Sequence, residues 1–359
     1  MKCTIVLSVL SSTVLGLLGA TAVLARAQPA ARRTGPGVQA ARDANEPAVL
    51  EQCKTPPPPA PSFTRGRLPP GFRAPSPIPA SYTIDAIPDV IAAGAKWKRV
   101  WKTDGNNADG IVATKDGGIL IAQNDNSAVV KLDRHGHASV LYRNTRTGGA
   151  LSYSKNGELF INERELNPAI WELSPERKLL ANRYQGDPLD CLGNVLNDLT
   201  ADSRGGVYFT QGGLFYADAH GVITRYGQNL RTNGIILSPD EKTLYVTNGA
   251  TLAAFDVQPD GSLTHQREFA KLPAPGDGSV IDAQGRIYVT GGYGVHVFSP
   301  QGEHLGDIPA PYSVISLTFS GRDKKTLYAV AETGMGFTQQ AAAILTIPMM
   351  AQGYEGRPK

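Results

Sequence analysis

The chain has 359 residues, of which 41% are hydrophobic and 19% are charged, and its formal net charge is +3. Much of the basic excess lies in the first 80 residues, so the charge gives no support to nucleic-acid binding. The part of the chain with globular composition, about 260 residues long, is within the range of one large β domain.

The N-terminus begins with Met1 and Lys2, followed by an apolar run over residues 5–24 and the small-residue sequence Ala-Arg-Ala at 25–27. This pattern is typical of a secretory signal peptide, so residues 1–27 are predicted to be cleaved on export and the protein to be secreted or periplasmic. The alternative is an uncleaved membrane anchor, because the run approaches the roughly 20 residues that cross a bilayer. Small and polar residues within the run favour the signal peptide.

Residues 28–80 are rich in Ala, Pro and Arg, and residues 56–59 are all proline. Such a segment buries too little apolar surface to offset its ordering entropy, so we expect it to be disordered or extended. Cys53 lies in this segment and Cys191 in the globular part. In an oxidising compartment these two residues can form a disulfide, and two free thiols are the alternative.

From Trp97 onward the sequence contains six copies of one short pattern, spaced roughly forty residues apart. Each copy reads as two strands around a tight turn; in the fifth, residues 278–282 lead into a turn at 283–285 and a second strand at 286–289. The turns carry Gly, Asn, Asp and Pro, and the second strands are rich in Tyr, Val and Ile. A further hairpin follows, so each copy predicts a four-stranded sheet.

The six copies predict an all-β, six-bladed β-propeller over residues 81–350, followed by a C-terminal tail at 351–359. Residues 97–101 are the candidate outer strand that closes the ring against residues 343–347. A pair of β-sandwiches is a weaker alternative because of the sixfold internal match. A seventh blade at residues 80–96 is a further alternative, although that stretch has no turn signal.

The residue that begins each copy is predicted to face the central channel, because the first strand of each propeller blade lines the axis. We call these the lead residues: Asp109, Gly149, Asn197, Asn233, Asp277 and Ser316. Two carboxylates and two amides with no basic residue among them are costly to bury unpaired, and such a donor set suits Ca²⁺ or another hard cation, with Zn²⁺, Mg²⁺ or Mn²⁺ left open. The alternative is a set of strand-entry turns in which each side chain bonds its own backbone. Recurrence at equivalent positions favours the metal.

Several other residues bear on which reaction the protein could catalyse. The six histidines show no spacing typical of a zinc site, and the absence of a G-x-S-x-G sequence leaves nucleophilic-serine chemistry with little support. Glu163 and Arg164, at the end of the second copy, are predicted to reach the channel mouth and hold a polar substrate, with a surface ion pair as the alternative. Asp198 is a further candidate substrate-binding residue or base, with a structural role in a strand-entry turn as its alternative.

Three segments carry a family resemblance: NDLTADS at 197–203, NGIILSPD at 233–240 and GDGSVID at 276–282. They resemble the core motifs of the gluconolactonase/senescence-marker-protein/luciferin-regenerating-enzyme family, and the resemblance covers about residues 100–347. Members of that family are six-bladed propellers, and many are divalent-metal lactonases. The resemblance implies that Asn233 and Asp277 match metal ligands and that Asn197 matches an Asn near metal and substrate. Asp109 stands where the family usually has Glu, and it is one methylene shorter.

The resemblance thus implies a metal-dependent lactonase acting on a small-molecule lactone or a sugar-acid-like substrate. In this reading Asp277 ligates the metal and helps to deprotonate the attacking water, with Asn197 beside it as a second catalytic residue. One alternative is a non-enzymatic propeller that binds a small molecule or a protein, with a structural ion in the channel. Another alternative is metal-free chemistry like that of strictosidine synthase-like propellers. The presence of both Asn233 and Asp277, which match metal ligands, argues against it.

Overall fold

The computed structural model describes residues 43–57, 82–103, 107–333 and 341–356. The predicted signal peptide, residues 1–27, lies outside the described residues, as do residues 28–42 and 58–80 of the predicted Pro/Ala-rich segment. No helix in the described part of the chain is long and apolar enough to span a membrane.

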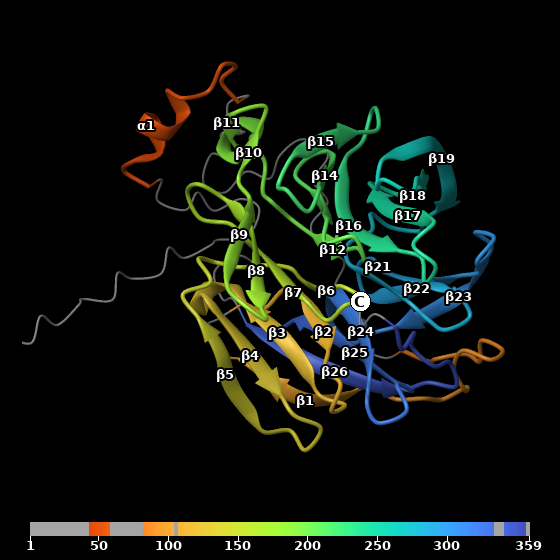
Figure 1. The fold of residues 1–359 in the computed structure, drawn as a ribbon. Helices are drawn as coiled ribbons and strands as arrows, with labels where there is room; N and C mark the ends of the chain where they lie inside the picture. The colour runs from red at the N-terminus through yellow and green to blue at the C-terminus, as the bar shows by residue number, and fades with distance from the viewer. Residues whose placement is uncertain (1–42, 58–81, 104–106, 334–340, 357–359) are drawn as a thin grey trace, which may run out of the picture.

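Six four-stranded antiparallel sheets surround a common centre, as Figure 1 shows. Blades 1 and 2 contain β2 (Ile111–Ala113), β3 (Ile119–Gln123), β4 (Ala128–Leu132) and β5 (Ala138–Arg143), then β6 (Leu151–Tyr153), β7 (Leu159–Glu163), β8 (Ala169–Ser174) and β9 (Lys178–Ala181). Blades 3 and 4 contain β12 (Leu199–Ala201), β13 (Val207–Thr210), β14 (Leu214–Ala217) and β15 (Ile223–Tyr226), then β16 (Thr232–Leu237), β17 (Thr243–Asn248), β18 (Thr251–Val257) and β19 (Leu263–Lys271). Blades 5 and 6 contain β20 (Ser279–Ile281), β21 (Ile287–Thr290), β22 (Gly294–Phe298) and β23 (His304–Pro309), then β24 (Ser313–Ser320), β25 (Thr326–Glu332), β26 (Ala342–Pro348) and β1 (Lys98–Lys102). The predicted all-β, six-bladed propeller is confirmed.

The ring closes through its first and last strands. β1 pairs antiparallel with β26, from Lys98 opposite Thr346 to Lys102 opposite Ala343, with an irregularity between Arg99 and Trp101. The orange β1 therefore completes the sheet of blue strands in Figure 1. This pairing confirms the outer strand predicted at residues 97–101 and ties the two ends of the domain together.

Apolar side chains of neighbouring blades pack against each other to form the core. Val112 and Leu120 of blade 1 pack with Leu151 and Leu159 of blade 2 in one buried cluster. The aromatic second strands contribute large side chains to these layers, and Tyr208 is fully buried between blades 3 and 4. A short strand that is buried on both faces reads as a continuous apolar run, which accounts for the composition of the second strands.

Residues 82–95 contain no strand, and therefore no seventh blade. Ile87 and Ile91 form an isolated bridge, and together with Ile84 and Val90 they are at most 4% exposed, packed on blades 5 and 6. The segment covers apolar surface of two existing blades.

Residues 43–57 correct the prediction of a disordered or extended segment over 28–80. They contain the short helix α1 (Glu46–Leu50), whose Val49 is buried. Cys53 forms a disulfide with Cys191 of the 3₁₀ segment η2 (Leu189–Leu192), with Cα atoms 5.5 Å apart. Figure 1 shows α1 beside β10 (Arg183–Tyr184) and β11 (Asp187–Pro188). The crosslink ties this segment to a propeller loop.

Candidate functional site

The lead residues are neighbours around the axis. The Gly110 amide, next to Asp109, donates to the Gly149 carbonyl at 2.6 Å, and Asn197 Nδ2 donates to Asn233 Oδ1 at 2.8 Å. On the other side of the ring, the Gly278 amide donates to the Ile315 carbonyl, adjoining Ser316. Residues far apart in sequence are thereby held at one end of the channel, as the repeat predicted.

Two glycines that follow lead residues permit this close approach. A Cβ on Gly234 would lie 2.0 Å from the carbonyl oxygen of Asp277, and a Cβ on Gly278 would lie 2.6 Å from that of Ile315. Contacts this short to backbone atoms cannot be relieved by a side-chain movement. The Asn-Gly and Asp-Gly pairs of the sequence therefore place a polar side chain and a crowded backbone side by side.

Asp277 lies in an electrostatically unfavourable position. Burial raises the pKa of its carboxyl well above the usual range, and the charges of Asp109, Asp198 and Glu332 raise it further, while Arg164 opposes them. Burial also raises the pKa of Glu332, at the end of β25, with the Asp109 charge as the next cause. The charge of Asp109 thus disfavours the charged forms of both Asp277 and Glu332.

Arg164 supplies positive charge to this group. Its guanidinium is 2% exposed and donates to Asp109 Oδ2, to the Leu196 carbonyl at 2.7 Å, and to both the carbonyl and Oδ1 of Asn197. The lead residues themselves include no positively charged residue, and Arg164 reaches them from the position that follows the end of β7. Arg164 was predicted to lie at the channel mouth, and in the structure it contacts the lead residues Asp109 and Asn197.

Glu163 departs from its prediction. Consecutive residues of a strand point to opposite faces, and Glu163 faces away from Arg164. Its side chain is 2% exposed and paired with Arg177, whose guanidinium lies 5.1 Å from the Trp171 ring. Burial raises the pKa of Glu163, opposed chiefly by Arg177. The structure therefore shows a buried ion pair with Arg177 for Glu163, in place of the predicted contact with a substrate at the channel mouth.

Asp198 has a structural contact in place of the predicted substrate contact. Its Oδ1 accepts from the amide of Leu199 at 2.8 Å and its Oδ2 from that of Ile235 at 3.0 Å, and the residue is 8% exposed. These bonds join blade 3 to blade 4, since Leu199 begins β12 and Ile235 lies in β16. The strand-entry role that was its alternative describes what the structure shows.

Asn162 is a residue of the site that sequence reasoning missed. It is fully buried, and its Oδ1 accepts from the amides of Gly149 and Ala150 while its Nδ2 donates to the carbonyls of Leu196 and Asn197. One amide side chain thus holds two neighbouring lead positions. Its location near the end of a second strand was the available signal, because that end of a hairpin lies beside the start of the first strand.

The axial residues fit a hard cation by their donor chemistry and their charge. All four candidate ligands, Asp109, Asn197, Asn233 and Asp277, offer oxygen, as Ca²⁺ prefers. Asn233 Oδ1 keeps a second lone pair while it accepts from Asn197, so the amide pair orients an oxygen donor. Burial is the largest cause of the raised pKa of Asp277, and the charges of Asp109, Asp198 and Glu332 add to it against Arg164. A divalent cation beside Asp277 would favour its charged form.

The histidines, for which no zinc spacing was found, are partly brought together. Within the described residues, one group of His, Cys, Asp or Glu ligand atoms lies within 4.8 Å of one another, and it consists of His296, His304 and Asp307. Asp307 Oδ1 lies 2.7 Å from both His296 Nδ1 and His304 Nε2. The hairpin of β22 and β23 creates this contact, which the separation of the two histidines in sequence did not suggest.

Comparison with known proteins agrees with the architecture. A gluconolactonase from Zymomonas mobilis is 27% identical over 297 residues, covering 69% of this chain and 81% of the relative. The lactonase drp35 from Staphylococcus epidermidis is 29% identical over 210 residues, covering 52% of this chain and 57% of the relative. The solved structure of a gluconolactonase from Xanthomonas campestris matches 71% of this chain and 90% of its own with a TM-score of 0.60 at 23% identity, which shows a shared fold.

The family signature itself covers just over half of the chain. The SMP-30/gluconolactonase/LRE-like region matches residues 145–333, which include Asn197, Asn233 and Asp277. The segments that carry the resemblance in the sequence lie inside this match. The chain is therefore a member of the SMP-30/gluconolactonase/LRE-like family.

Proposed function

We propose that this protein is a metal-dependent lactonase that hydrolyses a small-molecule lactone or a sugar-acid-like substrate. The observation that carries the proposal is the set of Asp109, Asn197, Asn233 and Asp277 at the start of neighbouring blades, where burial and nearby carboxylate charges both act on Asp277. Family membership and the relatives named gluconolactonase and lactonase support the same reaction.

Asp109, Asn233 and Asp277 would hold the divalent cation, with Ca²⁺ best suited to the all-oxygen set. A bound cation of this kind supplies a Lewis acid for the lactone carbonyl. Asn197 orients the oxygen of Asn233 through its amide, and Arg164 fixes Asp109 and Asn197 through its guanidinium. The described contacts therefore give each polar residue at the axis a partner that limits its movement.

Lactone hydrolysis joins a water oxygen to the carbonyl carbon and breaks the bond from that carbon to the ring oxygen. One proton of the water ends on the ring oxygen, and the other is released when the new carboxylic acid ionises. Asp277 is suited to accept the proton from the water, because a carboxylate with a raised pKa is a stronger base than an exposed one. Asn197, beside it, is the second residue that we assign to catalysis.

We also propose that the protein works outside the cytoplasm, secreted or in the periplasm. The leader-like residues 1–27 support this location, and so does the disulfide between Cys53 and Cys191, because such bonds persist in oxidising compartments.

One observation favours a second function, a propeller that binds a ligand without turnover. Arg164 contacts both Asp109 and Asn197, so two of the candidate ligands already have a cationic partner. In that case the axial residues serve structure or ligand binding, and the channel performs no hydrolysis.

A lactone panel distinguishes the two functions. The full chain is treated with chelator, and hydrolysis of aldonolactones and simple γ- and δ-lactones is measured before and after Ca²⁺, Mg²⁺, Mn²⁺ or Zn²⁺ is restored. We expect activity to be lost with chelator, recovered with metal, and reduced at least about 100-fold in Asp277→Asn, as for removal of a principal electrostatic group. Asp260→Asn, in the exposed turn between β18 and β19, is the matched control. Turnover that survives both chelation and Asp277→Asn would refute the proposal, and metal binding without turnover would favour the second function.

A further inference from the structure

A hollow of about 670 Å³ lies at the opposite end of the first strands from the lead residues. Its lining comes from the turn after β2, the turn after β6, the turn after β24 and the C-terminal residues Glu355 and Gly356. Asp109 precedes β2, whereas Lys115 and Asp116 follow it, so the strand separates the hollow from the axial site by about 15 Å. The hollow is distinct from the candidate metal site.

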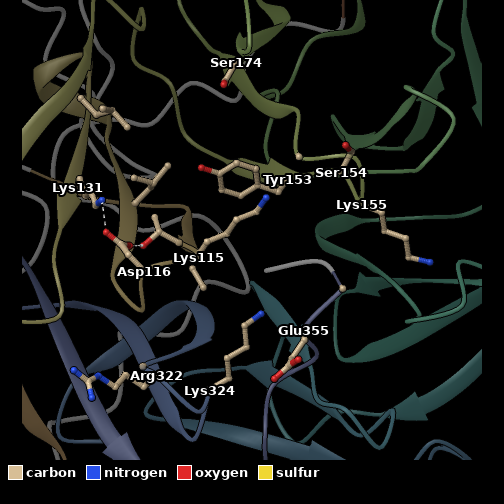
Figure 2. Close-up of a pocket in the computed structure, with 17 residues that line it drawn as sticks. Lys115, Asp116, Lys131, Tyr153, Ser154, Lys155, Ser174, Arg322, Lys324 and Glu355 are labelled. Carbon is tan, nitrogen blue, oxygen red and sulfur yellow. Dashed lines mark hydrogen bonds and ion pairs between the residues drawn. The ribbon is translucent and has the colours of Figure 1, made fainter.

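Lysine side chains dominate the polar lining. Figure 2 shows Lys115 and Lys324, from blades 1 and 6, both pointing into the open centre, whereas Lys155 and Arg322 point away from it. Lys131 is neutralised by Asp116, with Nζ 2.5 Å from Oδ2. No described residue pairs with the ammonium of Lys115. Glu355 also lines the hollow and its charge acts on Lys324, so the positive charge that stays unbalanced is centred on Lys115.

Lys324 is held in place by its surroundings. Its Nζ donates to the Tyr354 carbonyl at 2.9 Å, and the Gly353 amide donates to the Lys324 carbonyl at 2.9 Å, so the C-terminal residues fix this lysine from both ends. Burial lowers the pKa of the Lys324 amine, against the charge of Glu355. A desolvated amine in a fixed position gains more from an anionic partner than an exposed lysine does.

The remaining wall is apolar and aromatic. Leu141, on β5, is 49% exposed, and the Tyr153 ring lies beside the Lys115 side chain in Figure 2. Both residues line the hollow. A ligand that combines a doubly charged anionic group with a ring or short apolar part matches this distribution, and the volume accommodates a molecule of that size.

We propose that this hollow binds a small organic phosphate monoester, with its phosphate between Lys115 and Lys324 and its organic part against Leu141 and Tyr153. A phosphate monoester carries close to two negative charges at neutral pH, which two ammonium groups balance. The site takes its ligand independently of the axial residues and does not depend on the proposed lactonase reaction.

Calorimetric titration of the full chain with phenyl phosphate tests the proposal, with inorganic phosphate and benzoate titrated in parallel. We expect saturable binding of phenyl phosphate, weaker binding of inorganic phosphate, which has no ring, and at least about tenfold weaker binding of benzoate, which has one charge. Lys115→Gln and Lys324→Gln should each weaken phenyl phosphate binding about tenfold, as expected for the loss of one charge-assisted contact. Lys271→Gln, on the outer strand β19, is the matched control.

Lys115 lies in an exposed turn, so its substitution leaves the fold intact and the test interpretable. Absence of saturable phenyl phosphate binding by the parent at millimolar concentration would overturn the proposal. So would equal affinity of Lys115→Gln and the parent, or benzoate binding as tight as phenyl phosphate. Lactone hydrolysis by Lys115→Gln should equal that of the parent, which separates this test from that of the axial site.

Discussion

Replacing Arg164 by methionine perturbs the charge balance at the axis with little change in side-chain volume. The guanidinium is 2% exposed, and it pairs with the carboxylate of Asp109, which is 26% exposed, and with carbonyl groups of Leu196 and Asn197. Methionine keeps an apolar stem in the same space but donates no hydrogen bond. The substitution therefore leaves the Asp109 carboxylate without its cationic partner, whereas the carbonyl groups of Leu196 and Asn197 keep their hydrogen bonds from Asn162.

The magnitude follows from these contacts. Breaking a buried ion pair from one side costs about 3–5 kcal/mol, and each hydrogen bond to a charged donor contributes about 1.5–3 kcal/mol. These contributions overlap, and water can partly rehydrate Asp109, so we expect the free energy of unfolding to fall by about 3–5 kcal/mol without added metal. The exposed pair of Arg267 with Asp256 provides the control, because its loss costs at most about 1 kcal/mol.

The same variant should respond more strongly to calcium. Removing a positive charge beside Asp109 raises the affinity of the site for a cation, by about tenfold if the change is worth 1.4 kcal/mol. A cation at 100 times its Kd returns about 2.7 kcal/mol of stability. Urea denaturation of Arg164→Met, Arg267→Met and the parent, with chelator and with Ca²⁺, measures both effects. A loss below about 1 kcal/mol in Arg164→Met together with an unchanged calcium response would refute this account of the axis.

Three further predictions concern the packing, the buried acid and the disulfide. Gly234→Ala should lower the free energy of unfolding by about 1–3 kcal/mol or more, because its Cβ meets backbone, whereas Gly213→Ala, with contacts no closer than 3.4 Å, should cost under 1 kcal/mol; equal losses in urea denaturation would contradict the close approach. Because its pKa is raised, Glu163 binds its proton more tightly in the folded state than in the unfolded state, which stabilises the fold below pH 4.5 and is lost as pH rises through the raised pKa. Glu163→Gln should therefore gain stability relative to the parent from pH 4.5 to 7. A stability difference between the two proteins that does not change with pH would contradict the shift. Cys53→Ser should expose α1 to hydrogen exchange and proteolysis while the blades stay protected, and an equally protected α1 would show that the crosslink is not what orders it.

The sixfold repeat made the propeller architecture the most predictable part of the fold. Alternating turn and strand residues recur in every copy, so one misread blade does not change the architecture. The pairing of β1 with β26 was predictable for a related reason, because a ring of blades needs an N-terminal strand to close it. α1 was not predicted, because its segment has a Pro-rich composition and its contacts are made with the distant region around Cys191.

The lead residues were predicted to lie together at the axis, but the residues that contact them were not predicted. Repeat position alone places Asp109, Asn233 and Asp277 together, whatever their neighbours are. The direction of a side chain beside a strand end depends on the alternation within that strand, which is why adjacent residues Glu163 and Arg164 face opposite ways. Glu332 lies on a second strand and not at a lead position, so the repeat pattern did not predict it, although the end of β25 lies beside the start of β24.

Calcium titration of chelator-treated protein by calorimetry tests the central claim most directly. If the axial oxygens form one cation site, the parent binds a single Ca²⁺ per chain and Asp277→Asn weakens binding at least about 100-fold through loss of a carboxylate ligand. Asp260→Asn, in an exposed turn, binds like the parent. Calcium binding that Asp277→Asn leaves unchanged, or no calcium binding by the parent, would contradict a cation site at the axis.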